Sequence, residues 1–355
     1  MKQEEEHLKI LFFTNGTASH VWRADGVARR MNETTPHEMA VTTYDQWKNE
    51  TYGANIVIME MLTSHAMVET AKNMGAKVIY EADDIVLDAY GRERKNLMHV
   101  DKSFRSSAIE TIRKCDALTV ATEAMAKNYR QFTDAPIYVL PILMDYQYYG
   151  DAELVDLPKR NSDEIRIGWF GGKGHFEDLR MVLPAIKNVL KRDKRVKFVY
   201  CGYGGMDSDS LAMKAQWGED VLKEIPRERR EFAPGAPEDW WPYKHRFLDF
   251  DIGIAPLIDD EFNNAKCYTK WMEYSVFKTP VVASPTVYGE VIDHGKTGLI
   301  AKTTKEWENH LMALVNDATL RQKIGTAAAE DVRVNHNIED HWTKWVDTYG
   351  KVLRS

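Results

Sequence analysis

The sequence is poor in cysteine and has no long uncharged apolar run. Its three cysteines, Cys115, Cys201 and Cys267, are scattered and form no C-x-x-C pair, which argues against a disulfide framework and a cysteine zinc site. No stretch approaches the ~18 apolar residues that a membrane-spanning helix needs. The acidic start "MKQEEEHLKILFF" has the wrong charge order for a secretory signal. These absences predict a reduced, cytoplasmic protein.

Two common glycine fingerprints of nucleotide-binding proteins are also missing. The stretch "IGWFGGKGHFEDL" (167–179) contains no G-x-x-x-x-G-K-[ST]. Neither it nor "CGYGG" (201–205) completes G-x-G-x-x-G. A Rossmann oxidoreductase would need that second fingerprint, followed by an acidic residue about 20 residues further on. The sequence therefore disfavours a dinucleotide-dependent oxidoreductase and predicts no bound cofactor.

Excess positive charge is lacking as well. The net charge of −7 argues against a surface built for broad nucleic-acid binding. Three local stretches could still line a basic or aromatic groove, namely "KRDKRVK" (191–197), "PRERREF" (226–232) and "WWPYKHRF" (240–247). Solvated helix ends and loops are the simpler interpretation of the two basic stretches. A nucleic-acid partner thus stays open only as a local contact.

What the sequence has is a regular alternation of short apolar runs and helical stretches. The predicted strands are 8–13, 55–61, 77–82, 117–122, 137–141, 165–170, 196–202, 250–256 and 280–284. The predicted helices are 21–31, 65–74, 102–114, 123–131, 176–191, 208–223 and 264–277, with two or three more after 303. Continuous apolar strands separated by helices are typical of parallel sheets that are covered on both faces.

The alternation is interrupted once, which indicates two domains. We predict a Rossmann-like domain over 1–150, a polar linker over 151–164 and a second Rossmann-like domain over 165–335. The terminal segment 336–355 is predicted to be a helix with one aromatic face, because Trp342, Trp345 and Tyr349 recur at helical spacing. The fold class is therefore α/β, with two doubly wound parallel sheets.

Open α/β sheets bind ligands beyond the carboxyl ends of their strands, so the loops that follow strands are the first candidates. Gly16 follows the first strand, and Gly202 ends strand 196–202. Gly171, Gly172 and Lys173 follow strand 165–170 and precede a helix. Backbone amides and a lysine at a helix start can hold a phosphate. A turn after a strand often needs glycine in any case, so the pattern alone is a weak signal.

Acidic residues follow another predicted strand, in "YEADDIVLD" (80–88). Glu81, Asp83 and Asp84 could bind a metal, orient a sugar hydroxyl or cap the next helix. The pattern imitates the D-x-D pair of metal-dependent sugar transferases only loosely. We therefore predict no metal site.

The stretch "NNAKCYTKWMEY" (263–274) carries the most specific pattern. In one helix, Lys266, Lys270 and Glu273 would lie on one face. Lysines in the first turns of a helix add to a dipole that already favours anions, and a carboxylate further along can accept from ribose hydroxyls. The face would then suit a nucleoside diphosphate. The alternative is an exposed stripe with a Lys270–Glu273 ion pair.

The motifs together resemble glycosyltransferase family 4, the retaining nucleotide-sugar transferases of the GT-B fold. The resemblance is strongest in 165–301, through "IGWFGGKGHFEDL", "FDIGIAPL", "NNAKCYTKWMEYSVFKTPVVAS" and "GEVIDHGKTGLIA". "KVIYEADDIVLD" in the first half also looks like this family. The resemblance implies two domains that face a central cleft, with the terminal helix crossing back to the first domain.

By this resemblance Lys266 and Lys270 would hold phosphate and Glu273 the ribose, and the other expected site residues come from the loop patterns described above and from the predicted first-domain wall. The residues expected to bind the donor are Gly16, Gly171, Gly172, Lys173, His175, Gly202, Asn263, Lys266, Lys270 and Glu273. Those expected to line the acceptor and sugar side are His20, Arg23, Asp83 and Asp84. Lys173, Lys270 and Asp84 are the expected catalytic residues. Many members carry a glutamate eight residues before the ribose-binding one, where this chain has Ala265. The residue that contacts the transferred sugar therefore stays open.

The activity that this implies is transfer of a sugar, hexose or pentose, from a UDP- or GDP-sugar to an acceptor hydroxyl. Configuration would be retained and no metal would be required. The acceptor could be a saccharide, another glycoconjugate or a hydroxylated DNA base, and the protein a monomer or homodimer. A nucleotide-sugar epimerase of the same fold is the alternative. A non-catalytic sugar-binding module is disfavoured, because both lysines and the glutamate are present.

Overall fold

The computed structural model describes residues 7–14, 20–44, 53–61, 64–85, 102–149, 163–171, 175–201, 222–233 and 249–355. The chain divides into two compact units. The N-terminal unit comprises Met1–Asp145, Ala265–Cys267 and His336–Ser355, and the C-terminal unit comprises Tyr146–Asn264 and Tyr268–Asn335. The helix predicted at 208–223 lies outside the described residues.

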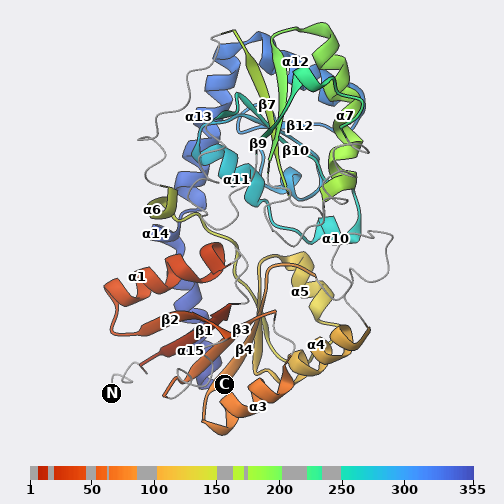
Figure 1. Ribbon diagram of the computed structural model, residues 1–355. Helices are drawn as coiled ribbons and strands as arrows, with labels where there is room; N and C mark the ends of the chain where they lie inside the picture. Colours follow the sequence, from red (N-terminus) through yellow and green to blue (C-terminus); the bar gives the residue numbers. More distant parts are fainter. Residues whose placement is uncertain are drawn as a thin grey trace. The chain divides into compact units, whose positions relative to one another are not determined.

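The N-terminal unit contains a parallel six-stranded sheet (Figure 1). Its order is β2-β1-β3-β4-β5-β6. The strands are β1 (Lys9–Thr14), β2 (Glu38–Thr43), β3 (Ile56–Glu60), β4 (Lys77–Ala82), β5 (Ala117–Val120) and β6 (Ile137–Val139). The helices are α1 (Gly26–Thr34), α3 (His65–Asn73), α4 (Lys102–Lys114), α5 (Glu123–Tyr129), α14 (Ile338–His341) and α15 (Thr343–Arg354). Strand β2 was not predicted.

The terminal helix α15 packs on one face of this sheet. Trp345 and Tyr349 are fully buried against α1 and against the strand residues on that face, among them Phe12, Ile58 and Ile79. Residues of this cluster occupy every second position along β1 and β3, as the two-residue period of a strand requires. The prediction of a terminal aromatic helix that packs against the N-terminal region is confirmed.

A buried ion pair sits at the carboxyl ends of these strands. Arg23, in a π-helical turn (Val21–Asp25), donates from Nε to Glu81 Oε1 at 2.6 Å. Its guanidinium also donates to the Leu140 carbonyl and lies 4.4 Å from the ring centroid of Trp345. Glu81 accepts in addition from the Thr119 hydroxyl. Buried charges are tolerated when they are paired and hydrogen-bonded in this way.

The C-terminal unit has a second parallel six-stranded sheet, in the order β12-β11-β10-β7-β8-β9 (Figure 1). The strands are β7 (Ile165–Phe170), β8 (Val196–Cys201), β9 (Arg230–Ala233), β10 (Ile252–Ala255), β11 (Val281–Ala283) and β12 (Leu299–Ile300). The helices are α6 (Tyr146–Tyr149), α7 (Phe176–Arg192), α10 (Glu261–Asn264), α11 (Thr269–Val276), α12 (Thr304–Asn316) and α13 (Ala318–Asn335). The predicted fold class, two doubly wound parallel sheets, is confirmed.

Helices α7 and α12 bury one face of this sheet, and α11 lies on the other. Two glycines let α11 approach closely. A Cβ at Gly253 of β10 would lie 2.9 Å from the Tyr274 ring, and one at Gly325 of α13 would lie 1.9 Å from the Lys278 carbonyl oxygen. Both distances are far below van der Waals contact, so a side chain at either glycine would push α11 away from its neighbours. The position of α11 depends on this close packing.

We predict that Trp345→Ala will lower the free energy of unfolding of the N-terminal unit by about 3–5 kcal/mol, because it empties a fully buried site and removes the ring beside Arg23. Urea denaturation measures the change. Lys344→Ala, at an exposed position on the same helix, is the control and should stay within about 0.5 kcal/mol of the wild type. Equal stability of the two variants would contradict the role assigned to α15.

Candidate functional site

The helix predicted at 264–277 is broken in the structure. One turn, α10, ends at Asn264, and α11 begins at Thr269. The prediction of one continuous helix is therefore wrong, and Lys266 does not share a helix face with Lys270 and Glu273. At the start of α10, Asp260 Oδ1 accepts from the Asn263 backbone N–H at 2.8 Å.

Tertiary contacts explain the break. The segment Ala265–Cys267 belongs to the N-terminal unit. Within that unit the Ala265 carbonyl accepts from the Thr122 hydroxyl at 3.0 Å, and Lys266 Nζ lies 3.0 Å from Asp84 Oδ2. A carbonyl and an ammonium group held by these partners favour a non-helical path although Ala and Lys are good helix formers, because tertiary contacts override a preference worth only tenths of a kcal/mol per residue. Sequence periodicity carries no information about such contacts.

The helix that does form keeps the second half of the predicted pattern. Lys270 is the second residue of α11, in its first turn, and Glu273 follows one turn later. Residues at i and i+3 are neighbours on a helix surface, about 4.5 Å apart along the axis. The first turn of α11 also presents backbone N–H groups at the positive end of its dipole. Lys270 therefore stands where an anion is favoured.

A histidine from another loop meets Lys270. His175 precedes α7, and its Nε2 lies 3.4 Å from Lys270 Nζ. The Lys270 ammonium also lies 6.0 Å from the ring centroid of Phe170, at the end of β7. Two predicted donor-binding residues that are far apart in sequence thus come together at the carboxyl ends of β7 and β10. This is the edge where α/β sheets bind ligands.

A buried carboxylate, Asp178, joins the same loops. Its Oδ2 lies 2.9 Å from His175 Nδ1, while its Oδ1 accepts at 2.9 Å from both the Ile258 backbone N–H and Asn263 Nδ2. Asn263 also donates to the Ile258 carbonyl at 2.9 Å. Asp178 and Asn263 have no exposed surface. Asn263, a predicted site residue, is therefore buried and supports Asp178 and the Ile258 backbone by hydrogen bonds.

Glu273 is buried as well. Its Oε1 accepts from the Tyr149 hydroxyl at 3.4 Å, and only 2% of the residue is exposed. Burial raises the pKa of Glu273 to about 8, against the lowering effects of Lys270 and of the Tyr149 hydrogen bond. Tyr149 lies on the short helix α6 and packs edge-on against Phe277 at 5.9 Å. Glu273 thus already accepts from a hydroxyl group.

The predicted residues of the N-terminal unit have different surroundings. His20 is partly exposed, and a hydrogen bond from Nδ1 to Asp25 at 2.9 Å raises its pKa. Arg23 is wholly buried and bound to Glu81, which excludes it from a substrate-facing wall, contrary to our prediction. Asp84 Oδ2 lies 3.0 Å from Lys266 Nζ, its Oδ1 accepts from the Ile85 backbone N–H at 2.9 Å, and Asp83 beside it is partly buried.

Several predicted residues cannot be placed. Gly16, Gly172, Lys173 and Gly202 lie outside the described residues. Gly171 is described and buried, and a Cβ there would lie 2.6 Å from the Trp169 ring. Within the described residues, no group of three or more His, Cys, Asp or Glu side chains is arranged to hold a metal ion. No described helix combines the length and apolar character needed to cross a membrane.

Sequence reasoning missed Asp178 and Tyr149. Asp178 follows Glu177 in the first turn of α7, where acidic residues are common because they favour the helix dipole. Only its spacing of three from His175 hinted at a shared face. Tyr149 lies in the aromatic run just before the predicted linker, where nothing in the pattern pointed to Glu273.

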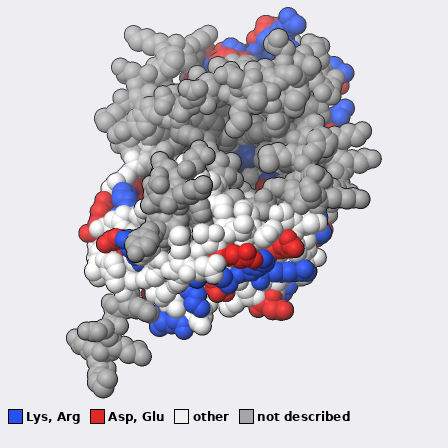
Figure 2. Space-filling view, turned by 60° about the horizontal axis from the view of Figure 1, so that its bottom comes forward, with Lys and Arg blue, Asp and Glu red and all other residues white. Residues whose placement is uncertain are grey.

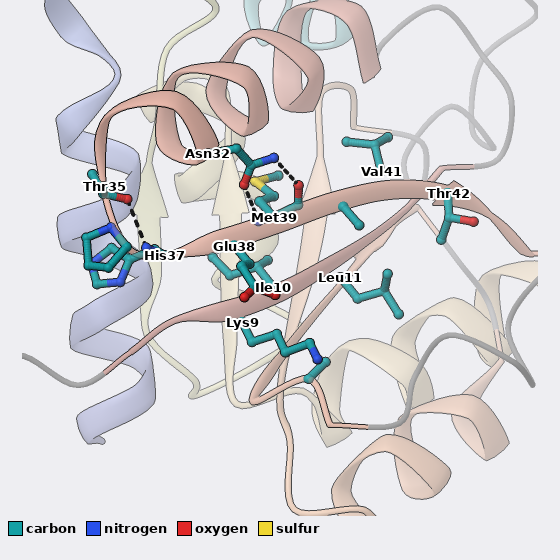
Figure 3. Close-up of a pocket in the computed structure, with 13 residues that line it drawn as sticks. Lys9, Ile10, Leu11, Asn32, Thr35, His37, Glu38, Met39, Val41 and Thr42 are labelled. Carbon is teal, nitrogen blue, oxygen red and sulfur yellow. Dashed lines mark hydrogen bonds between the residues drawn. The ribbon is translucent and has the colours of Figure 1, made fainter.

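The N-terminal unit has a separate hollow of about 710 Å³ beside the edge strand β2 (Figure 3). Asn32 of α1 reaches into its wall, where it donates to the Met39 carbonyl at 2.9 Å and accepts from the Met39 N–H at 2.8 Å. An edge strand exposes unpaired backbone groups, and Asn32 satisfies one pair of them. No predicted site residue lines this hollow.

Charge is mixed over the described surface of the N-terminal unit. Figure 2 shows acidic and basic side chains interleaved on the face that it presents. Ion pairs account for part of this pattern, including Lys72 with Asp116 at 3.2 Å and Lys114 with Glu69. That described surface offers no broad single-signed field, in keeping with the net charge.

Solved structures with similar folds cover nearly the whole chain. Sucrose-phosphate synthase from Thermosynechococcus elongatus matches with a TM-score of 0.68 at 12% identity, over 98% of this chain and 100% of that one. HepE from Anabaena, solved with UDP and glucose, matches with 0.64 at 13% identity, over 97% and 100%. A Listeria monocytogenes protein described as a UDP-N-acetylglucosamine 2-epimerase matches with 0.56 at 12%, over 98% and 97%. The fold is therefore GT-B-like.

The family match concerns the second half of the chain. Residues 164–317 match the family described as glycosyl transferases, group 1. Comparison with curated proteins found no match. The matched range contains Asp178, His175, Lys270 and Glu273, so the site described above lies inside it. The match confirms the resemblance to group 1 glycosyltransferases for this part of the chain, and the GT-B-like fold agrees with it.

Proposed function

We propose that this enzyme binds the nucleoside diphosphate of its donor, UDP or GDP carrying a hexose or pentose, at the first turn of α11. The observation that carries the proposal is the meeting of Lys270 and His175, with Nζ and Nε2 3.4 Å apart, one turn before Glu273. The Lys270 ammonium group and the first backbone N–H groups of α11 converge where the diphosphate would lie, and His175 Nε2 accepts from that ammonium group. Lys266 has no part in this arrangement, because it pairs with Asp84.

Glu273 would then bind the ribose. An ionised carboxylate can accept from both ribose hydroxyls, the same interaction that dinucleotide folds use. In the described structure one carboxyl oxygen accepts from Tyr149, whose hydroxyl we expect the ribose to replace. Because burial raises the pKa of Glu273 to about 8, ionisation at neutral pH would accompany donor binding rather than precede it.

The chemical step follows from where charge develops. As the glycosidic bond breaks, negative charge builds on the departing diphosphate, and Lys270, oriented by His175, and the α11 amides can stabilise it. These groups could supply that stabilisation without a metal. In the proposed step the acceptor hydroxyl attacks from the face that the leaving group vacates, and its proton passes to the leaving phosphate oxygen. Configuration is then retained.

Product analysis would identify the class of acceptor. Incubation of a UDP-sugar and GDP-sugar panel with saccharide acceptors and with DNA containing hydroxymethylated bases tests the two acceptor classes. Transfer to either identifies it. Conversion of the donor in the absence of any acceptor would instead indicate an epimerase, an activity named for one protein of similar fold.

We predict that Lys270→Ala will lower kcat/KM roughly a hundredfold, because it removes one cationic donor from the leaving group. Lys296→Ala, at an exposed lysine of the same unit, should leave the rate within twofold. Steady-state assays with the preferred donor measure both. Donor binding by Lys270→Ala as tight as that of the wild type would contradict the assignment of the diphosphate site.

We predict a pH-dependent stability difference between the wild type and Glu273→Gln. The folded pKa of about 8 lies above the ordinary value of 4.5, so the stabilising contribution of protonated Glu273 is complete below 4.5 and is lost as the pH rises to about 8. The free energy of unfolding of the wild type should therefore fall relative to that of the variant across this range. Urea titrations at several pH values measure it.

Glu290→Gln, at an exposed site of the same unit, is the matched control for this experiment. Its pH profile should run parallel to that of the wild type. A Glu273→Gln profile that also runs parallel to the wild type would show that Glu273 is not buried as described.

A further inference from the structure

Asp178 is a buried charged residue that neither the sequence motifs nor the proposed mechanism uses. It has no exposed surface and binds His175 from the loop after β7 and Ile258 and Asn263 from the stretch after β10. A fully buried carboxylate is costly unless its partners compensate for lost hydration. The loops after β7 and β10 are built around this group. Asp178 contacts His175, and His175 in turn contacts Lys270, the proposed phosphate donor.

We propose that Asp178 is a positioning residue that sets the tautomer of His175 and, through His175, aims the ammonium group of Lys270 at the donor diphosphate. The proposal rests on the proposed function for its binding consequence. The positioning itself rests only on the contacts among the three side chains.

The hydrogen-bond chemistry fixes the direction of each contact. An ionised carboxylate only accepts hydrogen bonds, so His175 Nδ1 must carry the hydrogen that it shares with Asp178 Oδ2. In the neutral ring the other nitrogen, Nε2, then has a free lone pair. Lys270 Nζ lies 3.4 Å from that nitrogen and can only donate. The chain therefore runs from ammonium to imidazole to carboxylate, and each member orients the one before it.

Replacement of Asp178 by asparagine would reverse this chain. The Oδ1 position faces two donors, Ile258 N–H and Asn263 Nδ2, and must remain an oxygen. The new amide nitrogen is thereby placed against His175 Nδ1, which would have to accept. His175 then carries its hydrogen on Nε2, facing the Lys270 ammonium donor to donor. The shape of the site is conserved, while Lys270 loses His175 Nε2 as a hydrogen-bond acceptor.

The tautomer is measured by long-range ¹H–¹⁵N correlation spectra of histidine-labelled protein, with His175→Gln to assign the signals among the eleven histidines. We expect the wild type without ligand to show the Nδ1–H form of neutral His175, and Asp178→Asn to show the Nε2–H form. The Nε2–H form in the wild type would overturn the proposal. This outcome does not depend on whether Asp178→Asn folds.

Binding of UDP or GDP, whichever the wild type prefers, gives the second readout. We expect Asp178→Asn to bind the nucleotide roughly ten- to a hundredfold more weakly, as for loss of a hydrogen bond to a charged group. The double variant Asp178→Asn/His175→Gln should bind no more weakly than His175→Gln alone, because Asp178 acts only through His175. Additive losses would overturn the proposal.

Asp193→Asn is the matched control. Asp193 follows the other end of α7 and accepts from Arg195, away from the site. It should leave both the tautomer and the affinity unchanged. An Asp178→Asn protein that is destabilised but binds the nucleotide as tightly as this control would assign Asp178 a merely structural role. If the wild type bound neither nucleotide, the proposed function would be wrong, while the spectra would still decide the tautomer.

Discussion

The loops that leave β7 and β10 are tied together by one carboxylate without solvent exposure, Asp178. Parallel strands bring their carboxyl ends to one edge of the sheet, but the loops beyond them need their own constraint. Asp178 provides it, with one oxygen on His175 and the other on Ile258 and Asn263. The position of His175 relative to Lys270, and with it the proposed phosphate site, depends on that group.

A second constraint acts on α11 from beneath. Gly253 leaves room for the Tyr274 ring, whose hydroxyl lies 3.4 Å from the Gly168 and Ile254 carbonyls. The helix is thereby seated directly on the sheet. Its first turn lies beside the loop that Asp178 organises, and its Glu273 is buried one turn later. Packing and hydrogen bonding thus set the site together, although most of the groups that do so never touch a ligand.

The fold could be predicted from the sequence because buried parallel strands appear in it as continuous apolar runs. Strands β2, β9 and β12 escaped prediction. Strand β2 alternates between buried and exposed residues at one sheet edge, β9 is a four-residue edge strand within a basic stretch, and β12 has only two residues. The site was predicted in part. Lys270 and Glu273 keep their helical spacing, whereas the path of Ala265–Cys267 is set by Thr122 and Asp84, which are distant in sequence. Asp178 resembled an ordinary first-turn acid.

Arg23 shows the limit of inference from residue type. Arg23 was predicted to line the acceptor and sugar side, but its burial beside Trp345 makes it part of the core. The sequence predicts the aromatic helix that carries Trp345 but does not show that Trp345, more than 300 residues after Arg23, is the partner of Arg23. Burial, which only the fold decides, separates a structural charge from a functional one.

The central claim is that Lys270, His175 and Glu273 together hold the nucleotide of the donor. A crystal structure of the enzyme with bound UDP or GDP tests this most directly. Our account predicts the diphosphate within hydrogen-bonding distance of Lys270 Nζ, which His175 Nε2 orients, and the ribose hydroxyls on Glu273 in place of the Tyr149 hydroxyl. A nucleotide bound elsewhere, with Glu273 still closed over by Tyr149, would contradict it.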